Sequence, residues 1–209
     1  MPALRKLEQS SSGCVSVPRL WPGSTVVCIG GGPSLTREDV EFCRGRAPVI
    51  AIKDAQRLAP WAEVLYSGDD KWWKWYRGAP EFSGLKFGLE PTRTPWPGVE
   101  ILDITGDTGI EQAPTGLRTG SNSGYQAVNL AIHLGATRVL LLGYDMKPTN
   151  GRDHWFGSHP YGATPPYQLF LDRFPTMVEP LKELGVEVLN VTRDSALDVF
   201  PRAALEQVL

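Results

Sequence analysis

The chain has 209 residues, and 42% of them are hydrophobic, which suits one α/β domain with a single sizeable core. Its 21 basic and 23 acidic residues leave a formal net charge of −2, so no global basic field attracts nucleic acid. No apolar run reaches the roughly 18 residues of a membrane span. We therefore expect neither a membrane span nor a nucleic-acid partner.

The cysteines and the N-terminus indicate the compartment. Cys14, Cys28 and Cys43 are odd in number and lack a CxxC spacing, which indicates a reducing environment without a disulfide framework. The N-terminal segment MPALRKLEQSSSGC lacks the apolar core of a signal peptide. These features predict a cytoplasmic protein.

The first part of the chain predicts an arm followed by a strand, a turn and a helix. Residues 1–23 are polar and predict a loose arm or a short added strand, ahead of one domain over 24–209. The β-branched run Val26–Ile29 predicts a buried strand. A glycine turn follows, and then a helical pattern over 36–42, with Ser34 or Thr36 as its N-cap.

The middle of the chain continues this alternation with weaker signals. Its expected elements are strands at 48–52 and 62–66, a helix at 71–77, weak strands near 85–87 and 99–102, and a glycine-rich loop over 105–120.

The C-terminal half has the most regular patterns. A wide apolar face predicts a helix over 121–134, ended by Gly135, and the apolar run 138–142 predicts a central parallel strand covered on both faces. The remaining expected elements are a long loop over 147–166, a helix over 167–184, a strand over 186–191 and a partly helical end over 195–209. The pattern predicts a single-domain α/β fold, a doubly wound, Rossmann-like and mostly parallel sheet with a long loop or lid after the central strand.

The glycine turn is the first candidate binding element. A strand, a glycine turn and a helix start together offer free N–H groups and a positive dipole end to an anion such as phosphate. Glycine also tolerates a positive φ and lets a ligand approach the backbone. The turn is not a P-loop, because no Lys-Ser/Thr pair follows, and it lacks the GxGxxG spacing. The candidates are Gly30, Gly31, Gly32 and Ser34, and a tight turn without a ligand is the structural alternative.

A second candidate element precedes the helix at 121–134. The segment from Arg118 to Gly124 has more hydroxyl and amide donors than one helix cap needs, which suits a phosphate, carboxylate or ribose ligand. Asn122, Ser123 and Gly124 are the candidates, and simple capping is the alternative.

Acidic residues follow two of the predicted strands. Gly143, Tyr144 and Asp145 come after the strand at 138–142, at the edge where open α/β sheets bind ligands. Asp145 could hold a ribose hydroxyl, a substrate or a metal, or could cap a turn. Asp69 and Asp70 stand at the end of another strand and are candidate metal ligands.

Two of the three histidines lie in the long loop. His154 and His159 have no core reason to be there, and an imidazole can act as a general acid or base near neutral pH. A metal site suits them less, since a third ligand is not evident. His133, on the apolar helix, is expected to be a packed structural residue. The basic and aromatic segment 71–77 could stack bases or sugars, but an amphipathic helix with its tryptophans in the core explains it better.

Four stretches, in this order, resemble the family 42 sialyltransferases of bacterial cell surfaces: CIGGGPSL, NSGYQAVNLAIHLGATRVLLLGYDM, HWFGSHP and NVTRDSALDVF. They are also similar to the archaeal 6-hydroxymethylpterin diphosphokinases and to phage-encoded relatives of no settled function. The resemblance covers most of the chain from Val26 to Phe200, and the order and spacing of the short motifs carry it.

The sialyltransferase resemblance implies a glycosyltransferase that transfers a sugar from a CMP-sugar to a hydroxyl of an unidentified acceptor, without a required cofactor. The donor would lie against the glycine turn, Ser123 and Gly124, and the segment Gly143–Asp145. The family's base is a histidine in a loop reading like Tyr-Ile-Gly-His, which His159 matches with one extra residue. The family has an asparagine as the second residue of the glycine turn, and another where this chain has Lys53-Asp54.

Two alternatives stay open beside this interpretation. The diphosphokinase resemblance implies an ATP-dependent enzyme with magnesium on Asp69, Asp70 or Asp145. The phage resemblance implies a nucleotide-binding or phage-associated protein without catalysis, in the host cytoplasm. Whether the chain forms a homo-oligomer also stays open.

Overall fold

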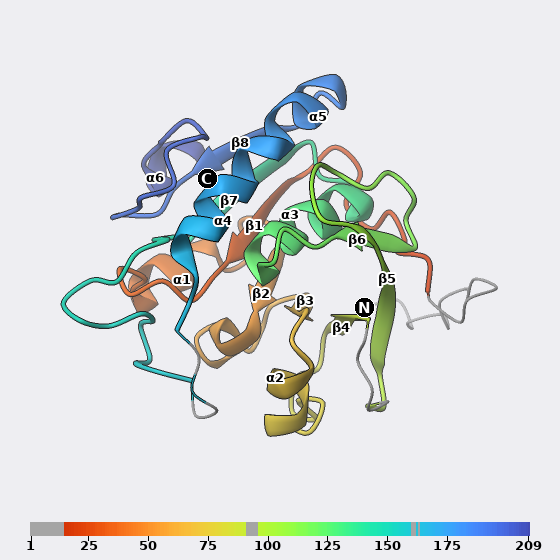
Figure 1. The fold of residues 1–209 in the computed structure, drawn as a ribbon, viewed down its shortest axis with the longest axis horizontal. Coiled ribbons are helices and arrows are strands. Elements are labelled where there is room, and N and C mark those ends of the chain that lie inside the picture. Colours follow the sequence, from red (N-terminus) through yellow and green to blue (C-terminus); the bar gives the residue numbers. More distant parts are fainter. Residues whose placement is uncertain (1–14, 91–95, 160–161, 163) are drawn as a thin grey trace.

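A computed structural model describes residues 15–90, 96–159, 162 and 164–209. Within these ranges, eight strands form one all-parallel sheet in the order β6-β5-β4-β3-β2-β1-β7-β8 (Figure 1). The strands are β1 (Thr25–Ile29), β2 (Val49–Ile52), β3 (Val64–Ser67), β4 (Leu85–Leu89), β5 (Val99–Gly106), β6 (Gly116–Arg118), β7 (Arg138–Leu142) and β8 (Glu187–Asn190).

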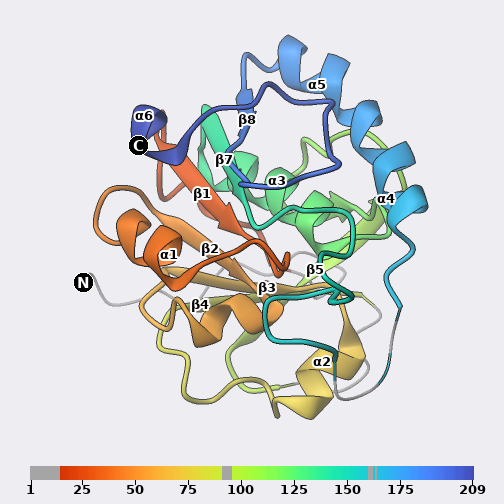
Figure 2. The same ribbon diagram turned by 90° about the vertical axis from the view of Figure 1, so that its left-hand side faces the viewer.

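Helices cover both faces of the sheet, so the predicted doubly wound α/β fold is confirmed (Figures 1 and 2). One apolar layer joins the sheet to α3 (Ser123–Leu134), η2 (Phe174–Met177) and α5 (Val178–Glu183). The other joins it to α1 (Arg37–Cys43), η1 (Lys53–Arg57), α2 (Asp70–Trp75) and α6 (Leu205–Val208). The helix α4 (Tyr167–Arg173) leads into η2.

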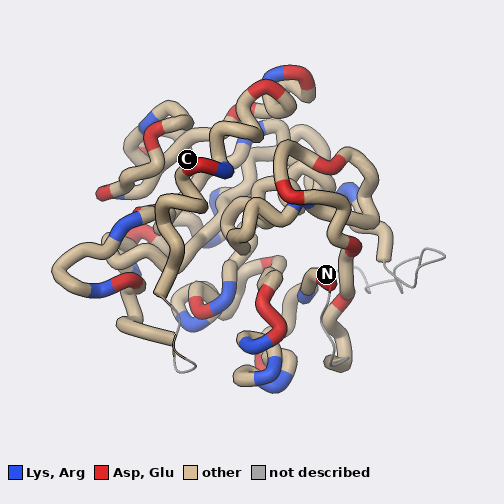
Figure 3. The backbone as a smooth tube through the Cα atoms, viewed as in Figure 1, with Lys and Arg blue, Asp and Glu red and all other residues tan. Residues whose placement is uncertain are grey.

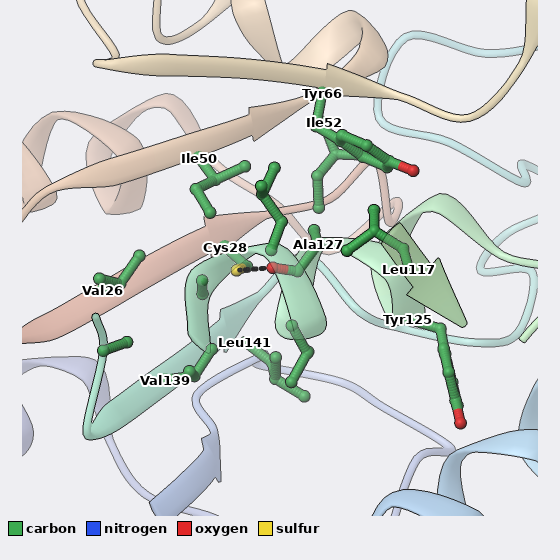
Figure 4. Close-up of a cluster of buried hydrophobic side chains, with 14 of the residues drawn as sticks. Val26, Cys28, Ile50, Ile52, Tyr66, Leu117, Tyr125, Ala127, Val139 and Leu141 are labelled. Atoms are coloured by element: carbon green, nitrogen blue, oxygen red, sulfur yellow. Dashed lines mark hydrogen bonds between the residues drawn. The ribbon is translucent and has the colours of Figure 1, made fainter. Parts of the chain in front are cut away.

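The two apolar layers together explain why these strands are apolar along nearly their whole length. Residues of β1, β2 and β7 alternate between the two layers, and Figure 4 shows one side of this packing around Cys28. The Cys28 thiol lies 3.6 Å from the carbonyl oxygen of Ala127 on α3. Burial raises the pKa of the thiols of Cys28 and Cys43 to about 12, so both are inert packing groups, while Cys14 lies outside the described residues.

The order of the strands creates a switch point. The chain runs outward from β1 through β2 to β6, and then returns to add β7 and β8 on the other side of β1. The apolar run of β7 predicted a central strand. In the structure, β7 is instead second from one edge of the sheet. Its residues 139–142 are buried because helices cover both faces there, which does not require a central position.

Three other predictions need correction. The expected glycine-rich loop over 105–120 contains β6, a strand too short to produce a sequence pattern. The expected helix over 167–184 is divided into α4, η2 and α5, with Pro175 and Pro180 in the divided region. The helix expected from Ser121 begins at Ser123, with Asn122 as its N-cap.

The described part of the N-terminal segment, 15–23, lies against the domain rather than apart from it. Val15 and Val17 are buried, and their backbone N–H groups donate to the carbonyl oxygens of Ile101 and Pro114. The rest of the predicted arm lies outside the described residues.

Along the backbone tube of Figure 3, the positions of Lys and Arg are interspersed with those of Asp and Glu. None of the helices in the described ranges is long and apolar enough to cross a membrane.

Candidate functional site

A cavity of about 700 Å³ lies at the carboxyl ends of the strands around the switch point between β1 and β7. This is the place where open α/β sheets bind ligands. Of the predicted site residues, all but Ser34 line it, namely Gly30, Gly31, Gly32, Asp69, Asp70, Asn122, Ser123, Gly124, Gly143, Tyr144, Asp145, His154 and His159.

The glycine turn, Gly30–Ser34, uses most of its N–H groups inside the protein. Gly30 N–H donates to the carbonyl of Leu142 and Gly32 N–H to that of Gly143, both at 2.8 Å. Ser34 N–H donates to Oδ2 of Asp145, also at 2.8 Å. These three donors therefore secure the turn to the end of β7 and are not free for a phosphate.

Glycines are needed in this turn because other backbone atoms pack closely against it, and not because the turn has a positive φ. None of the three has a φ in the left-handed region, which corrects one expectation of the sequence. A Cβ on Gly30 would lie 2.7 Å from the Gly143 carbonyl oxygen, and a Cβ on Gly32 would overlap the Asp145 carboxylate. Packing against residues 143–145 thus requires glycine at these two positions.

Asp145 is a buried carboxylate at the base of the cavity. Its side chain is 1% exposed, and burial raises its pKa, while the N–H of Ser34 acts in the opposite direction. Its Oδ1 has no hydrogen-bond partner among the described residues. Asp145 therefore secures the glycine turn with one oxygen and has acceptor capacity remaining on the other.

The N-terminus of α3 forms a second wall. Asn122 caps the helix, because its Oδ1 accepts the N–H groups of Gly124 at 2.6 Å and Tyr125 at 3.1 Å. The hydroxyl of Tyr144 donates to the Gly124 carbonyl at 3.1 Å, and the Tyr144 side chain is buried. Tyr144 thus joins the end of β7 to the start of α3, and this wall faces the cavity with the positive end of a helix dipole.

The loop after β7 covers the glycine turn. We call residues 147–159 the histidine loop; it is teal in Figure 2. The N–H of Trp155 donates to the Gly31 carbonyl at 3.1 Å, and a Cβ on Gly31 would lie 3.3 Å from Nδ1 of His154. The guanidinium of Arg57 lies over the ring of Trp155, at 5.3 Å from its centroid. The loop is therefore held against both the glycine turn and η1.

The two loop histidines lie together. Their ring centroids are 4.6 Å apart, and Phe156 stacks on His154 at 4.9 Å with an interplanar angle of 8°. Burial lowers the pKa of both histidines. The pKa of His159 falls to about 4, because Lys53 and a protonated His154 also disfavour its charged form. Both imidazoles are therefore neutral at pH 7 and can accept a proton.

Two functional candidates were missed by sequence reasoning. Asp54, in η1, lies with Oδ2 at 3.5 Å from Nδ1 of His159, and Lys53 pairs with Asp69 at 3.2 Å. Both residues line the cavity. The sequence did contain a signal for them. Lys53 and Asp54 directly follow β2, just as Asp69 follows β3, and polar residues in such positions lie at the carboxyl edge of the sheet.

Backbone strain gathers around the cavity. Lys53, Ser121 and Met146 all line it, and each has a left-handed backbone, with φ of 54°, 55° and 52°. A non-glycine residue in this region costs of order 1–3 kcal/mol, and such residues concentrate at ligand sites. Arg77, Ala79 and Asn150 also have a left-handed backbone but do not line the cavity, so half of the strained non-glycine residues in the described chain lie at the cavity.

The candidate metal ligands are engaged by other groups. Asp69 caps α2 by accepting the N–H of Lys71 at 2.9 Å and pairs with Lys53, and Asp70 pairs with Lys74 at 2.7 Å. No three His, Cys, Asp or Glu residues of the described chain gather in a way that could hold a metal ion.

Two other segments have structural roles. His133 is buried, with Nε2 at 2.9 Å from the Gly116 carbonyl, so it connects α3 to β6. In the segment 71–77, Trp72 and Trp73 are fully buried, while Trp75 is 57% exposed. This is the amphipathic helix that was favoured over a stacking surface.

No family model matches this chain, and no curated protein matches it. Among solved structures, its fold is similar to that of the MAf glycosyltransferase from Magnetospirillum magneticum AMB-1, with a TM-score of 0.61 and 12% sequence identity. The match covers 93% of this chain and 36% of that one, so this chain spans about a third of the length of the protein it matches. At this identity the likeness establishes the fold.

Proposed function

We propose that the chain is a nucleotide-sugar-dependent glycosyltransferase with a CMP-sugar as donor and a hydroxyl compound as acceptor. The observation that carries the proposal is the cavity at the switch point, which has a helix N-terminus on one side and the paired histidines on another. The fold likeness to the MAf glycosyltransferase supports the class of reaction. The preference for CMP rests on the motif resemblance.

In the proposed step, the acceptor oxygen attacks the anomeric carbon of the donor sugar. The glycosidic bond forms as the bond between that carbon and the phosphate oxygen breaks, and its electron pair leaves with the nucleoside phosphate. His159 takes the acceptor's hydroxyl proton as general base. The start of α3 and the ammonium of Lys53 stabilise the leaving phosphate by their positive potential.

The low pKa of His159 is compatible with this role. A pKa of about 4 leaves the imidazole neutral at pH 7, although a base is most effective when its pKa is close to the working pH. A phosphate anion bound in the cavity would favour the imidazolium and raise this pKa toward neutrality. The histidine therefore becomes a stronger base when the donor is bound.

The test is a thermal-shift screen with CMP, UDP, GDP and ATP, each with and without magnesium. A ligand that binds only the native state raises the midpoint by mass action. Stabilisation by CMP without metal is the expected result, and UDP or GDP in its place would keep the transferase class but change the donor. ATP acting only with magnesium would favour the diphosphokinase, and no response to any nucleotide would overturn nucleotide-dependent transfer.

A further inference from the structure

Asp54 is a buried carboxylate next to the proposed base. It lies in η1, directly after β2, and is 2% exposed. A buried carboxylate is costly unless its oxygens accept hydrogen bonds or face positive groups. The partners of Asp54 therefore indicate why it is placed there.

Three of these partners hold the carboxylate in one orientation. The indole Nε1 of Trp72 donates to Oδ2 at 2.9 Å, and the hydroxyl of Tyr76 donates to Oδ1. The guanidinium of Arg57 lies 3.8 Å from Oδ1. Because both oxygens are engaged from the side of α2 and η1, the carboxylate cannot rotate freely.

The fourth partner is His159, whose Nδ1 lies 3.5 Å from Oδ2. We propose that Asp54 is the positioning residue of His159: its Oδ2 accepts the Nδ1 proton, so that the neutral imidazole carries its lone pair on Nε2. The catalytic meaning of this arrangement rests on the proposed function, but the tautomer itself does not.

The physical reason is the acceptor character of the carboxylate. An Nδ1 lone pair would face the negative oxygen and be repelled, whereas an Nδ1–H is attracted to it. At 3.5 Å the two atoms do not form a hydrogen bond in this structure, but catalytic hydrogen bonds in unliganded sites are often long or poorly aligned and tighten when substrate binds. Trp72, bonded to Oδ2, and Tyr76, bonded to Oδ1, keep the carboxylate in place while this happens.

The same contact would assist proton transfer. When Nε2 accepts the acceptor's hydroxyl proton, the imidazole becomes a cation. Lys53 and His154 disfavour that cation, and Asp54 and Asp69 favour it. Asp54 is the acid in direct contact, so it stabilises the charge that forms on His159 during transfer.

The tautomer can be measured without any activity assay. The chain has three histidines, so a protein labelled with ¹⁵N-histidine gives three imidazole patterns, assigned with single His→Gln variants. At pH 7.5, long-range ¹H–¹⁵N correlations should show His159 with its proton on Nδ1. A proton on Nε2 in the wild-type protein would overturn the proposal.

A pair of variants separates positioning from structural support. Without the carboxylate, the Asp54→Ala variant should contain His159 as a mixture of the Nδ1–H and Nε2–H tautomers. Tyr76→Phe removes a different hydrogen bond of the same carboxylate and should leave the Nδ1 proton in place. An unchanged tautomer in folded Asp54→Ala would contradict the proposal; if that variant does not fold, the wild-type spectrum decides.

The catalytic consequence is tested with a CMP-sugar as donor. Asp54→Ala should lower kcat by roughly 10²-fold, within the range of general acid–base catalysis, while the KM for the donor stays near its wild-type value. A KM effect alone would contradict a positioning role. A wild-type protein that transfers no sugar would overturn the proposed function, and the NMR result would still decide the role of Asp54.

Discussion

The glycine turn and the histidine loop border the same cavity but use their polar groups differently. In the turn, the N–H groups of Gly30, Gly32 and Ser34 are all bonded to residues 142–145. In the loop, the Nε2 of His154 is buried without a hydrogen-bond partner among the described residues, and His159 has a strongly lowered pKa. The turn is therefore a rigid support, and the loop carries the groups that can react.

This difference changes how a glycine-rich motif should be interpreted. The turn has the composition of an anion-binding element, but its glycines are needed because β7 and Asp145 lie so close to them. The cavity also faces the N-terminus of α3, where the helix dipole is positive although Asn122 already accepts the N–H groups of Gly124 and Tyr125. The motif thus marks one wall of the cavity, and in the proposed function other residues supply the chemistry.

The largest expected effect is on the loop. His159→Ala should reduce sugar transfer by roughly 10²–10⁴-fold with nucleotide affinity nearly intact, because it removes only the proposed base. His154→Ala is the matched control and should be milder. Initial rates of transfer and calorimetric nucleotide affinities measure this difference. If His154→Ala is inactive and His159→Ala is active, His154 and not His159 is the base.

The second effect is the pH dependence of stability. His159 has a folded-state pKa of about 4, below its ordinary value of 6.5, so the unfolded chain binds more protons between these values. The contribution of His159 to the free energy of unfolding is fully present above pH 6.5. It is lost as the pH falls toward 4, which lowers the free energy of unfolding by up to about 3 kcal/mol.

Urea unfolding of the wild-type protein and of His159→Gln at several pH values measures this contribution. The stability of the wild type should fall more steeply than that of the variant between pH 6.5 and 4. Equal slopes in the two proteins would show that His159 is not held in its neutral form.

The third effect tests the rigid support. Gly32→Ala places a methyl group against the Asp145 carboxylate, which must move, and should lower the free energy of unfolding by about 1–3 kcal/mol. Gly31→Ala is the milder comparison, since its Cβ would lie 3.3 Å from Nδ1 of His154, a tight contact that requires the ring to shift by only a few tenths of an ångström. Denaturant titration compares them, and equal stabilities would mean that the turn can adapt.

The smallest effect tests how firmly the loop is held. Arg57→Ala removes the cation over Trp155, an interaction worth about 0.5–1 kcal/mol, so the loop should open roughly two- to five-fold more often. Hydrogen exchange of the Trp155 N–H, which donates to Gly31, reports this opening. Arg44→Ala removes a similar contact with Trp61 and should leave that rate unchanged.

Much of the fold could be predicted because its signals are local. The apolar runs of β1, β2, β3 and β7 and the cap Gly135 each identify an element from a few neighbouring residues. The strand β6 has three residues and lies in a glycine-rich segment, so it had no local signal. The position of β7 in the sheet depends on pairing with β1 and β8, which no local pattern contains.

The site was predictable where a local signal marked its residues, as at the glycine turn, at the end of β7 and in the loop with two histidines. In the sequence, Asp54 stands out only as a departure from a family motif, because its proposed role depends on His159, a residue 105 positions later in the chain. The occupied N–H groups of the glycine turn could not be anticipated either, since they depend on how closely β7 approaches. Contacts between distant segments therefore account for most of what was missed.

The strand order also determines when the site can form during folding. Strands β1 to β6 are consecutive and can pair as the chain emerges, but Thr25 of β1 must wait for Arg138 of β7 before its other edge is covered. Contacts over such a separation close slowly, because the loop entropy is lost before they form. We therefore expect the cavity to be one of the last features to assemble, and we expect a newly made chain to leave the N–H and C=O groups on one edge of β1 unpaired until the second half is synthesised.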